Sequence, residues 1–282
     1  MTSLSRSLPV LLFVAGVATA AAQDLPSGAS GSEGLDPARY AFYSGRYDEA
    51  ARMAADARQQ DPGSLESYEI RTSALLFALK RELGDDVQQE QKKIEECSRC
   101  PALLEAFGSE TVEGQGLLRR RIASDPDDAR GHYVLAKLDL NYLWLHNGIL
   151  GKRTGWSEYR EARRSLETVL GSNPEHLRAQ VAAAWIDYIV ATRMPWGTKW
   201  LFGGGNRTRA LEAMRAATTA NGDFYDTVEA RFGLWEMLVR EKNHTEASVI
   251  ARELVRDFPE NPVLTAFVKQ HGEVVSSLPR SR

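Results

Sequence analysis

Three copies of one short pattern recur along this chain. Each copy has a ring-bearing side chain, two polar residues of which the second is glutamate, and then alanine, at residues 47–50, 159–162 and 244–247. A proline follows each alanine by 12 residues, and these prolines are Pro62, Pro174 and Pro259. A repeated spacing of this kind indicates a fold in which one structural unit is stacked several times.

The residues between each alanine and its proline have helical spacing. The positions four and seven after the alanine are apolar in all three copies, so they share one helix face, and the proline ends the helix. Apolar residues also recur three and four apart elsewhere, as in 64–83, where Gly84 marks an expected helix end. Strand-like alternation does not extend over a useful length, so we predict an all-α fold.

Two weaker copies fill the gaps between the three clear ones. Residues 111–114 carry Gly114 in place of the alanine and reach Pro126 at the same 12-residue offset. Ala210, Met214 and Ala217 keep the apolar spacing of a fifth copy, although Gly222 replaces its proline. The units therefore end near residues 62, 126, 174, 222 and 259.

The first copy carries the most specific family signal. Residues 45–50 and 61–62 read G-x-Y-x-E-A and D-P, which resembles the second helix of the tetratricopeptide repeat, a helix–turn–helix unit of about 34 residues. The resemblance covers roughly residues 37–270. It implies a superhelix of about five antiparallel helical hairpins, a concave groove lined by the first helices, and protein or peptide binding in place of catalysis. Ala50, Ala162 and Ala247 would then let a neighbouring helix approach closely.

The ends of the chain are expected to lie outside this domain. Arg6, a short apolar run and small residues up to Ala22 are typical of a signal peptide, and the run is too short for a membrane anchor. We predict a signal peptide at 1–22, a flexible leader at 23–36, the helical repeat domain at 37–271 and a tail at 272–282. The protein would be exported, periplasmic or secreted, with no transmembrane segment in the mature chain.

The first helices offer candidate binding residues on the groove face. Arg130 and Arg178 occupy the same repeat position, four residues after Pro126 and Pro174. The following turns of these two helices carry Tyr133, Lys137, Trp185 and Tyr188. The two arginines could clamp a carboxylate of a peptide or small acid, or each could pair with acidic neighbours near its helix start, namely Asp127, Asp128 or Glu175.

Two lengthened repeats carry insertions between their helices, at 147–156 and 195–207. Both mix glycine, tryptophan and cations, and the second contains Trp196, Lys199 and Trp200. Adjacent hairpins of a solenoid present equivalent loops on one edge, so the insertions are expected side by side as an aromatic, cationic rim for an acidic or amphipathic partner. The alternative is structural, with the tryptophans capping the hydrophobic seam of the longer helices.

Cys97 and Cys100 form a C-x-x-C pair. Pro101 stands where haem attachment needs histidine, and the five histidines show no spacing that completes a zinc site. A thioredoxin-like site belongs to a βαβ context that the helical pattern lacks. In an oxidising compartment the pair is expected to form a local disulfide.

The net charge and the absence of catalytic motifs reduce the number of function classes that this sequence fits. A net charge of −3 argues against a nucleic-acid partner, and motifs of hydrolases, metalloproteases and phosphate loops are missing, so neither catalysis nor a cofactor is expected. The first hypothesis is an exported interaction or scaffold module, for example of a bacterial envelope complex. The second is a periplasmic binding or transport-accessory protein that holds a small anionic or amphipathic ligand inside the superhelix. A continuous groove would favour the first, and an enclosed apolar cavity would favour the second.

Overall fold

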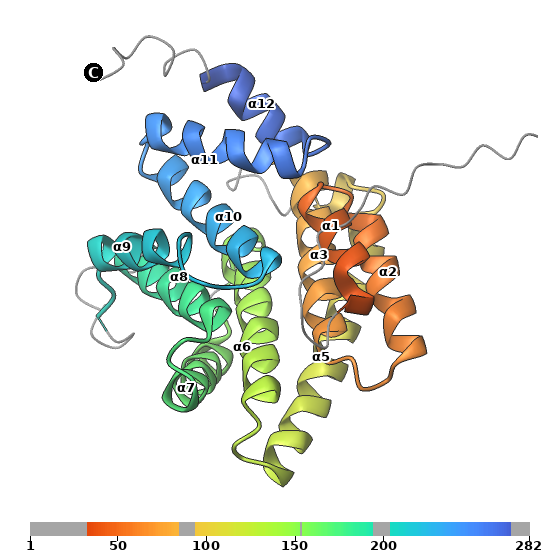
Figure 1. The fold of residues 1–282 in the computed structure, drawn as a ribbon. Coiled ribbons are helices and arrows are strands. Elements are labelled where there is room, and N and C mark those ends of the chain that lie inside the picture. Colours follow the sequence, from red (N-terminus) through yellow and green to blue (C-terminus); the bar gives the residue numbers. More distant parts are fainter. Residues whose placement is uncertain (1–32, 85–93, 153, 194–203, 272–282) are drawn as a thin grey trace, which may run out of the picture.

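The computed structural model describes residues 33–84, 94–152, 154–193 and 204–271, and these residues contain helices and no strand. The helices form five antiparallel hairpins and a final helix, stacked into a superhelix (Figure 1). The paired helices are α1 (Asp36–Tyr43) and α2 (Tyr47–Gln60), α3 (Glu66–Leu83) and α5 (Cys100–Ser124), α6 (Ala129–Leu143) and α7 (Trp156–Ser172), α8 (Leu177–Arg193) and α9 (Arg207–Ala217), and α10 (Phe224–Arg240) and α11 (His244–Asp257). The final helix is α12 (Pro262–His271), a 3-10 turn η1 (Glu33–Leu35) precedes α1, and a π-helical segment η3 (Trp144–Ile149) extends α6. The predicted all-α fold of about five hairpins is confirmed.

The helix ends follow the signals in the sequence. The helices α2, α5, α7 and α11 each end two residues before the proline of their repeat. Asp128 begins α6 by accepting a hydrogen bond from the Gly131 amide at 3.1 Å, and Asn206, Asp223 and Asn243 begin α9, α10 and α11 in the same way. Gly84 ends α3 with a φ of 74°, a conformation that favours glycine.

The small residues of the repeats lie at helix contacts. Ala50, Ala162 and Ala247 are each 0% exposed, as the repeat pattern predicts. In the second repeat, a Cβ on Gly114 would lie 2.7 Å from Leu138 Cδ1 and 2.9 Å from Tyr68 Cδ1. Glycine therefore replaces alanine where two large neighbouring side chains press closest to the helix backbone.

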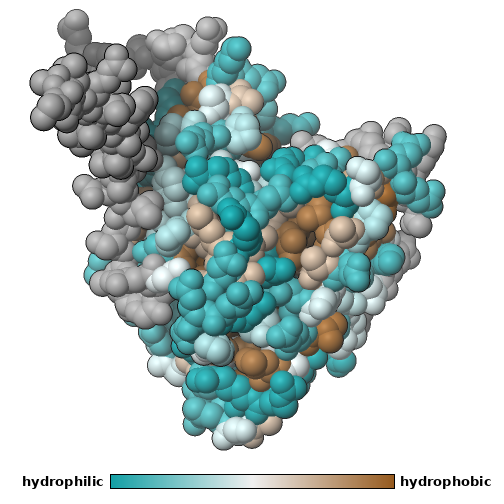
Figure 2. Space-filling view, turned by 90° about the vertical axis from the view of Figure 1, so that its right-hand side faces the viewer, coloured by the Kyte–Doolittle hydropathy of each residue, from teal (hydrophilic) through white to brown (hydrophobic). Residues whose placement is uncertain are grey.

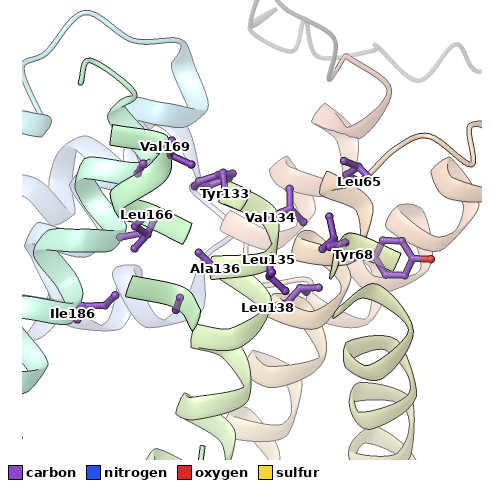
Figure 3. Packing of buried hydrophobic residues seen from close by; sticks show 14 of the residues in the cluster. Leu65, Tyr68, Tyr133, Val134, Leu135, Ala136, Leu138, Leu166, Val169 and Ile186 are labelled. Carbon is purple, nitrogen blue, oxygen red and sulfur yellow. The ribbon is translucent and has the colours of Figure 1, made fainter. Parts of the chain in front are cut away.

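The largest buried cluster joins α3, α5, α6, α7 and α8 (Figure 3). Leu138 and Leu118 are fully buried there, and Leu166 and Ile186 carry the cluster into α7 and α8. Burial of such side chains contributes about 1.5–3 kcal/mol each relative to exposure. Each hairpin is thus fixed to the next by shared apolar contacts.

The first and last hairpins also meet, which closes the array. The ring of Tyr43, at the end of α1, stacks on Phe232 of α10 with centroids 5.0 Å apart. Asn261 Nδ2 donates to the Tyr43 carbonyl at 2.8 Å, and Arg46 Nη1 bonds Glu260 Oε2 at 2.7 Å. Tyr225 donates its hydroxyl to the Asp36 carbonyl at 3.0 Å. The superhelix is therefore held at its two ends as well as between neighbours.

Two predicted boundaries differ from the structure. The sequence predicts a leader that reaches residue 36, but Leu35 and Asp36 are buried, so residues 33–36 belong to the fold. It also predicts that the first insertion begins at 147 as a loop, but η3 continues to Ile149, whose side chain is buried with Leu145. Both corrections have one cause, because apolar side chains at these positions pack onto the hairpins.

The segments 1–22, 195–203 and 272–282 lie outside the described residues. None of the helices within the described ranges has both the length and the apolar character that crossing a bilayer requires.

Candidate functional site

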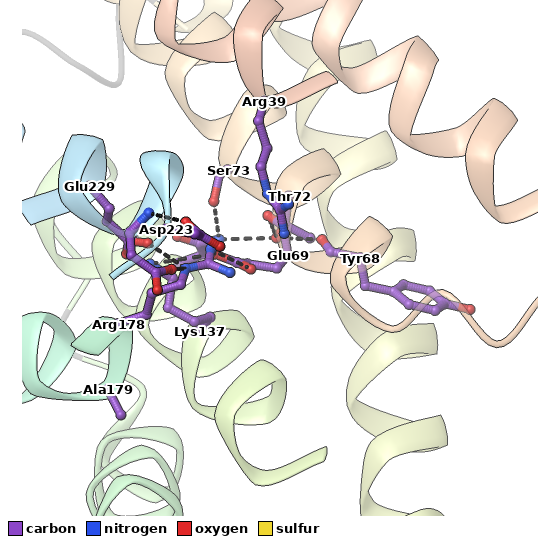
Figure 4. A network of polar contacts seen from close by, with 12 residues as sticks. Arg39, Tyr68, Glu69, Thr72, Ser73, Lys137, Arg178, Ala179, Asp223 and Glu229 are labelled. Atoms are coloured by element: carbon purple, nitrogen blue, oxygen red, sulfur yellow. Dashed lines mark hydrogen bonds and ion pairs between the residues drawn. The ribbon is translucent and has the colours of Figure 1, made fainter. Parts of the chain in front are cut away.

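Four charged side chains meet on the inner side of the superhelix, each from the first helix of a different hairpin. We call this group the ionic cluster; it contains Glu69 of α3, Lys137 of α6, Arg178 of α8 and Glu229 of α10 (Figure 4). Arg178 Nη2 donates to Glu69 Oε1 at 2.9 Å, and its Nε donates to Glu229 Oε2 at 2.8 Å. Lys137 Nζ donates to Glu229 Oε1 at 2.5 Å. Two cations and two carboxylates thus neutralise one another.

The effect of these ion pairs on the pKa of Glu229 is larger than the effect of burial. Burial alone would raise the pKa of Glu229, but Lys137 and Arg178 oppose it and lower the pKa to about 2. Glu229 is therefore ionised at neutral pH. The cluster is an internally satisfied network of charges, and a ligand carboxylate would have to displace Glu69 or Glu229 to reach Arg178.

Two tyrosines lie near the ionic cluster. The Arg178 guanidinium lies over the Tyr133 ring, 5.1 Å from its centroid, and Tyr133 is only 3% exposed. Burial raises the pKa of Tyr133 and of Tyr43 well above its usual value. Tyr43 stacks on Phe232 of α10, and Glu229 of the same helix belongs to the ionic cluster, so α10 links the closure of the array to the cluster.

Arg130 has a different environment from its repeat equivalent. Its guanidinium forms an ion pair with Glu66 of α3, and its side chain is 45% exposed against 14% for Arg178. The acidic neighbours proposed from the sequence are not the partners of either arginine. Asp128 instead pairs with Arg121 and caps α6.

The carboxylates that bind the two arginines were missed in the sequence, although a signal for them exists. The position four residues after each of the first four repeat ends holds Glu66, Arg130, Arg178 and Asp226. Glu66 and Arg130, at successive repeat positions, form an ion pair. Arg178 and Asp226 are also at successive repeat positions and have opposite charges, with Arg178 Nε 3.8 Å from Asp226 Oδ1. Glu69 and Glu229 each follow one turn later. Comparing charges at equivalent repeat positions would have found these partners.

A row of half-buried aromatic rings runs beside the ionic cluster, toward the other end of the first helices. We call it the aromatic band; it consists of Phe42 of α1, Phe77 of α3, Trp144 of η3 and Trp185 of α8. Successive ring centroids are 5.3, 6.2 and 5.7 Å apart, and the two tryptophans are nearly parallel, at 9°. The π-helical segment places Trp144 in this row, and such segments often occur at functional sites.

Two cations lie over the tryptophan pair. Arg240 Cζ is 6.0 Å from the Trp144 centroid and 5.7 Å from that of Trp185, and Arg240 donates to Glu236 at 2.6 Å. Lys80 Nζ is 5.9 Å from the Trp144 centroid, and no carboxylate among the described residues lies within bridging distance of it. The aromatic band thus combines apolar ring surface with a positive charge that the described part of the chain does not neutralise.

The remaining predicted site residues divide between these features and the second insertion. Trp185 belongs to the aromatic band, whereas Tyr188 is buried beneath it and donates its hydroxyl to Glu241 at 2.9 Å. Trp196, Lys199 and Trp200 lie outside the described residues, and so does the predicted contact between the two insertions. Cys97 and Cys100 are joined by a disulfide at the start of α5.

Two hollows lined by described residues are both open to solvent. One of about 450 Å³ lies between α2, α3 and α5, beside Arg58, Tyr68 and Arg71. Arg58 and Arg71 both bind Glu110 there, so their charges are already paired. The face on this side of the molecule is mostly hydrophilic, with separate apolar patches (Figure 2).

Another hollow, of about 630 Å³, lies between the end of α8 and the start of α9. Neither is an enclosed apolar cavity of the kind that a small ligand inside the superhelix would need.

A family model matches part of this chain. The model for the tetratricopeptide repeat covers residues 201–262, which include α9, α10 and α11. Among solved structures, a thermophilic TPR protein from Thermus thermophilus is similar over 85% of this chain and 97% of its own, with 16% sequence identity and a TM-score of 0.45. No curated protein matches the chain.

The matched residues contain one complete hairpin, α10 and α11, in which Ala247 and Pro259 take the positions that the repeat pattern assigns to them. The same pattern recurs in the first and third hairpins, and weaker copies of it occur in the second and fourth. Residues 201–262 are therefore similar to the tetratricopeptide repeat family, whose stacked hairpins serve in general as protein-interaction modules.

Proposed function

We propose that this protein is an exported, non-catalytic interaction module whose partner protein docks on the aromatic band. The observation that carries the proposal is the parallel pair Trp144 and Trp185, half-buried on the first helices with Lys80 and Arg240 over it. Tryptophan and arginine are the residues that most often dominate the free energy of protein association. A partner segment with an apolar or aromatic side chain beside a carboxylate fits this surface, since the carboxylate would pair with Lys80.

Export is supported by two observations of different kinds. Residues 1–22 have the charged, apolar and small-residue regions of a signal peptide. Cys97 and Cys100 form a disulfide, which persists in oxidising compartments and is rare in the cytosol. A bacterial envelope complex is the setting that we propose. Trp196, Lys199 and Trp200 stay a predicted extension of the same surface.

Affinity capture from the native envelope, with the mature protein as bait, tests the proposal. We expect one or more specific proteins to be retained. Lys80→Glu reverses the charge beside Trp144 without removing core packing, and it should weaken binding of a retained partner by about tenfold or more. Trp185→Ala should weaken binding at least as much, because it removes half of the stacked pair.

The matched control is Trp156→Ala. Trp156 is 41% exposed at the start of α7, outside the aromatic band, and stacks on Tyr159. This variant should bind as the wild type does. Circular dichroism and thermal unfolding establish that each variant is folded. Retention of no specific protein, or equal binding by the Lys80, Trp185 and Trp156 variants, would contradict docking on the aromatic band.

A further inference from the structure

The two cysteines differ in their access to solvent. Cys100 is 0% exposed and packs with Leu103 and Phe107 in a buried cluster, whereas Cys97 is only partly buried. A thiol from another molecule can therefore approach the Cys97 sulfur more easily than the Cys100 sulfur. An external thiol that opens this disulfide would bond to Cys97 and release Cys100 as the leaving thiol.

The disulfide adds little to what already holds this part of the chain. It closes a loop with a sequence separation of 3, and short loops gain the least stability from cross-linking. Arg99, between the two cysteines, donates to Glu82 Oε1 at 2.7 Å and to Asp48 Oδ1 at 2.6 Å. These bonds tie the loop to α3 and α2, and the side chain of Cys100 is held in the core. The two sulfurs would stay close together after reduction.

The start of α5 favours a thiolate at Cys97. The helix has 25 residues and begins at Cys100, whose backbone N–H donates to Cys97 Sγ at 3.1 Å. The positive end of a helix dipole and a backbone donor both stabilise negative charge on sulfur. Such a sulfur is a good leaving group in disulfide exchange and a good nucleophile at neutral pH.

From the unequal exposure of the two sulfurs, the short loop and the helix start, we propose that Cys97 and Cys100 are a redox-active pair that accepts two electrons from the thiols of a partner protein. The first partner thiolate attacks Cys97 Sγ, the Cys97–Cys100 bond breaks, and Cys100 leaves as a thiolate that takes a proton from water. A second partner thiolate then attacks the partner sulfur of the mixed disulfide, and Cys97 leaves as a thiolate. The partner gains one disulfide, and this chain ends with two reduced cysteines. The proposal does not depend on the aromatic band.

Glutathione is the probe for the first test. The full chain is equilibrated with mixtures of reduced and oxidised glutathione, and the exchange is stopped with acid. The protein is then unfolded so that both free thiols, including the buried Cys100, can take up a maleimide mass tag. We expect a change from no tag to two tags as the reduced fraction rises, with an unchanged far-UV circular dichroism spectrum of the equilibrated protein. A pair that is reduced only when denaturant is present during the equilibration, or that loses helicity when it is reduced, would be a structural disulfide and would overturn the proposal.

The second test separates the two sulfurs. Cys100→Ser leaves Cys97 alone, and Cys97→Ser leaves Cys100 alone, so each variant is the control for the other. With oxidised glutathione, Cys100→Ser should form the mixed disulfide at least about tenfold faster than Cys97→Ser, because its sulfur is accessible and stabilised as a thiolate. Equal rates would contradict the assignment of Cys97. If either variant fails to fold, the titration of the wild-type pair still decides whether the disulfide is exchangeable.

Discussion

Arg178 and Glu69 lie 109 residues apart in the sequence, and the Arg178 guanidinium donates to both oxygens of the Glu69 carboxylate, at 2.9 and 3.1 Å. The two residues come from the second and fourth hairpins, and Glu229 of the fifth hairpin binds the same guanidinium. Contacts in an open array of repeats join only adjacent units. The bond between Arg178 and Glu69 therefore shows that non-adjacent hairpins meet across the superhelix, as the first and last hairpins do at Tyr43.

Replacing Arg178 with methionine should destabilise the fold strongly. The methionine side chain fills part of the space of the arginine stem, but Glu69 and Glu229 are left with Lys137 as their only cation within the ionic cluster. Removing one partner of a buried ion pair costs about 3–5 kcal/mol. Arg130→Met, at the equivalent repeat position, removes an exposed pair and should cost about 0–1 kcal/mol. Urea unfolding of both variants measures the difference, and equal losses would show that Arg178 is not buried among charges.

Asp139 should make stability fall as pH rises. The side chain is 0% exposed and accepts a hydrogen bond from Gln115 Nε2 at 2.7 Å, and burial, with Glu161 adding to it, raises its pKa to about 8. The unfolded chain releases this proton at a pH of about 4. Between these values the folded state alone holds the proton, so the contribution of Asp139 to the free energy of unfolding decreases from about pH 4 to pH 8.

Asp139→Asn tests this dependence, because asparagine keeps the shape and the acceptor oxygen without an ionisable group. The variant should gain stability relative to the wild type as the pH is raised from about 5 to about 8, as measured by urea unfolding at each pH. Asp127→Asn in an exposed turn is the control for the loss of one carboxyl group. A difference between variant and wild type that stays constant with pH would show that Asp139 does not titrate in this range.

Ala162→Trp should overpack the contact between α7 and its neighbours. Ala162 is 0% exposed within the largest buried cluster, and inserting a large side chain at such a site costs about 1–3 kcal/mol or more. Glu167→Trp places the same side chain at an exposed position of the same helix. Its thermal unfolding should remain close to that of the wild type. An unchanged melting temperature for Ala162→Trp would place this alanine away from any helix contact.

Gly45→Ala probes the contact between the first hairpin and the final helix, α12. Gly45 has a φ of 80°, and a Cβ added to it would lie 3.0 Å from Cδ of Pro262, at the start of α12. Gly151 has a φ of 61° with no atom within 4 Å of such a Cβ, so Gly151→Ala carries the backbone strain alone. We expect Gly45→Ala to lose more stability than Gly151→Ala, by about 1 kcal/mol, in thermal unfolding. Equal losses would mean that the rigid proline ring does not press on Gly45.

The hairpins could be predicted from the sequence because their signals are local. Pro62, Pro174 and Pro259 end helices through their own backbone chemistry, and the small Ala162 marks a contact that any stacked hairpin makes. Gly84 ends α3 for the same kind of reason. These features depend on only a few neighbouring residues, so they can be recognised in a single sequence.

The candidate site was harder to predict because its parts come from distant segments. Arg130 and Arg178 look equivalent in the repeat pattern, yet one lies at the surface and the other in the ionic cluster. The difference arises from the way the last hairpin folds back, as in the bond from Asn261 to the Tyr43 carbonyl 218 residues earlier. Helical periodicity contains no information on such contacts.

The meeting of Tyr43 with Phe232 also fixes how many units this protein can have. A solenoid with free ends can gain or lose an internal unit by gene duplication or deletion and keep its local contacts. Here an added hairpin would carry Phe232 and Asn261 away from Tyr43, and it would separate Glu229 from the hairpins whose charges it neutralises. A change in the number of repeats would therefore require both ends of the array to change together. Substitutions and loop insertions can alter its surfaces without this requirement.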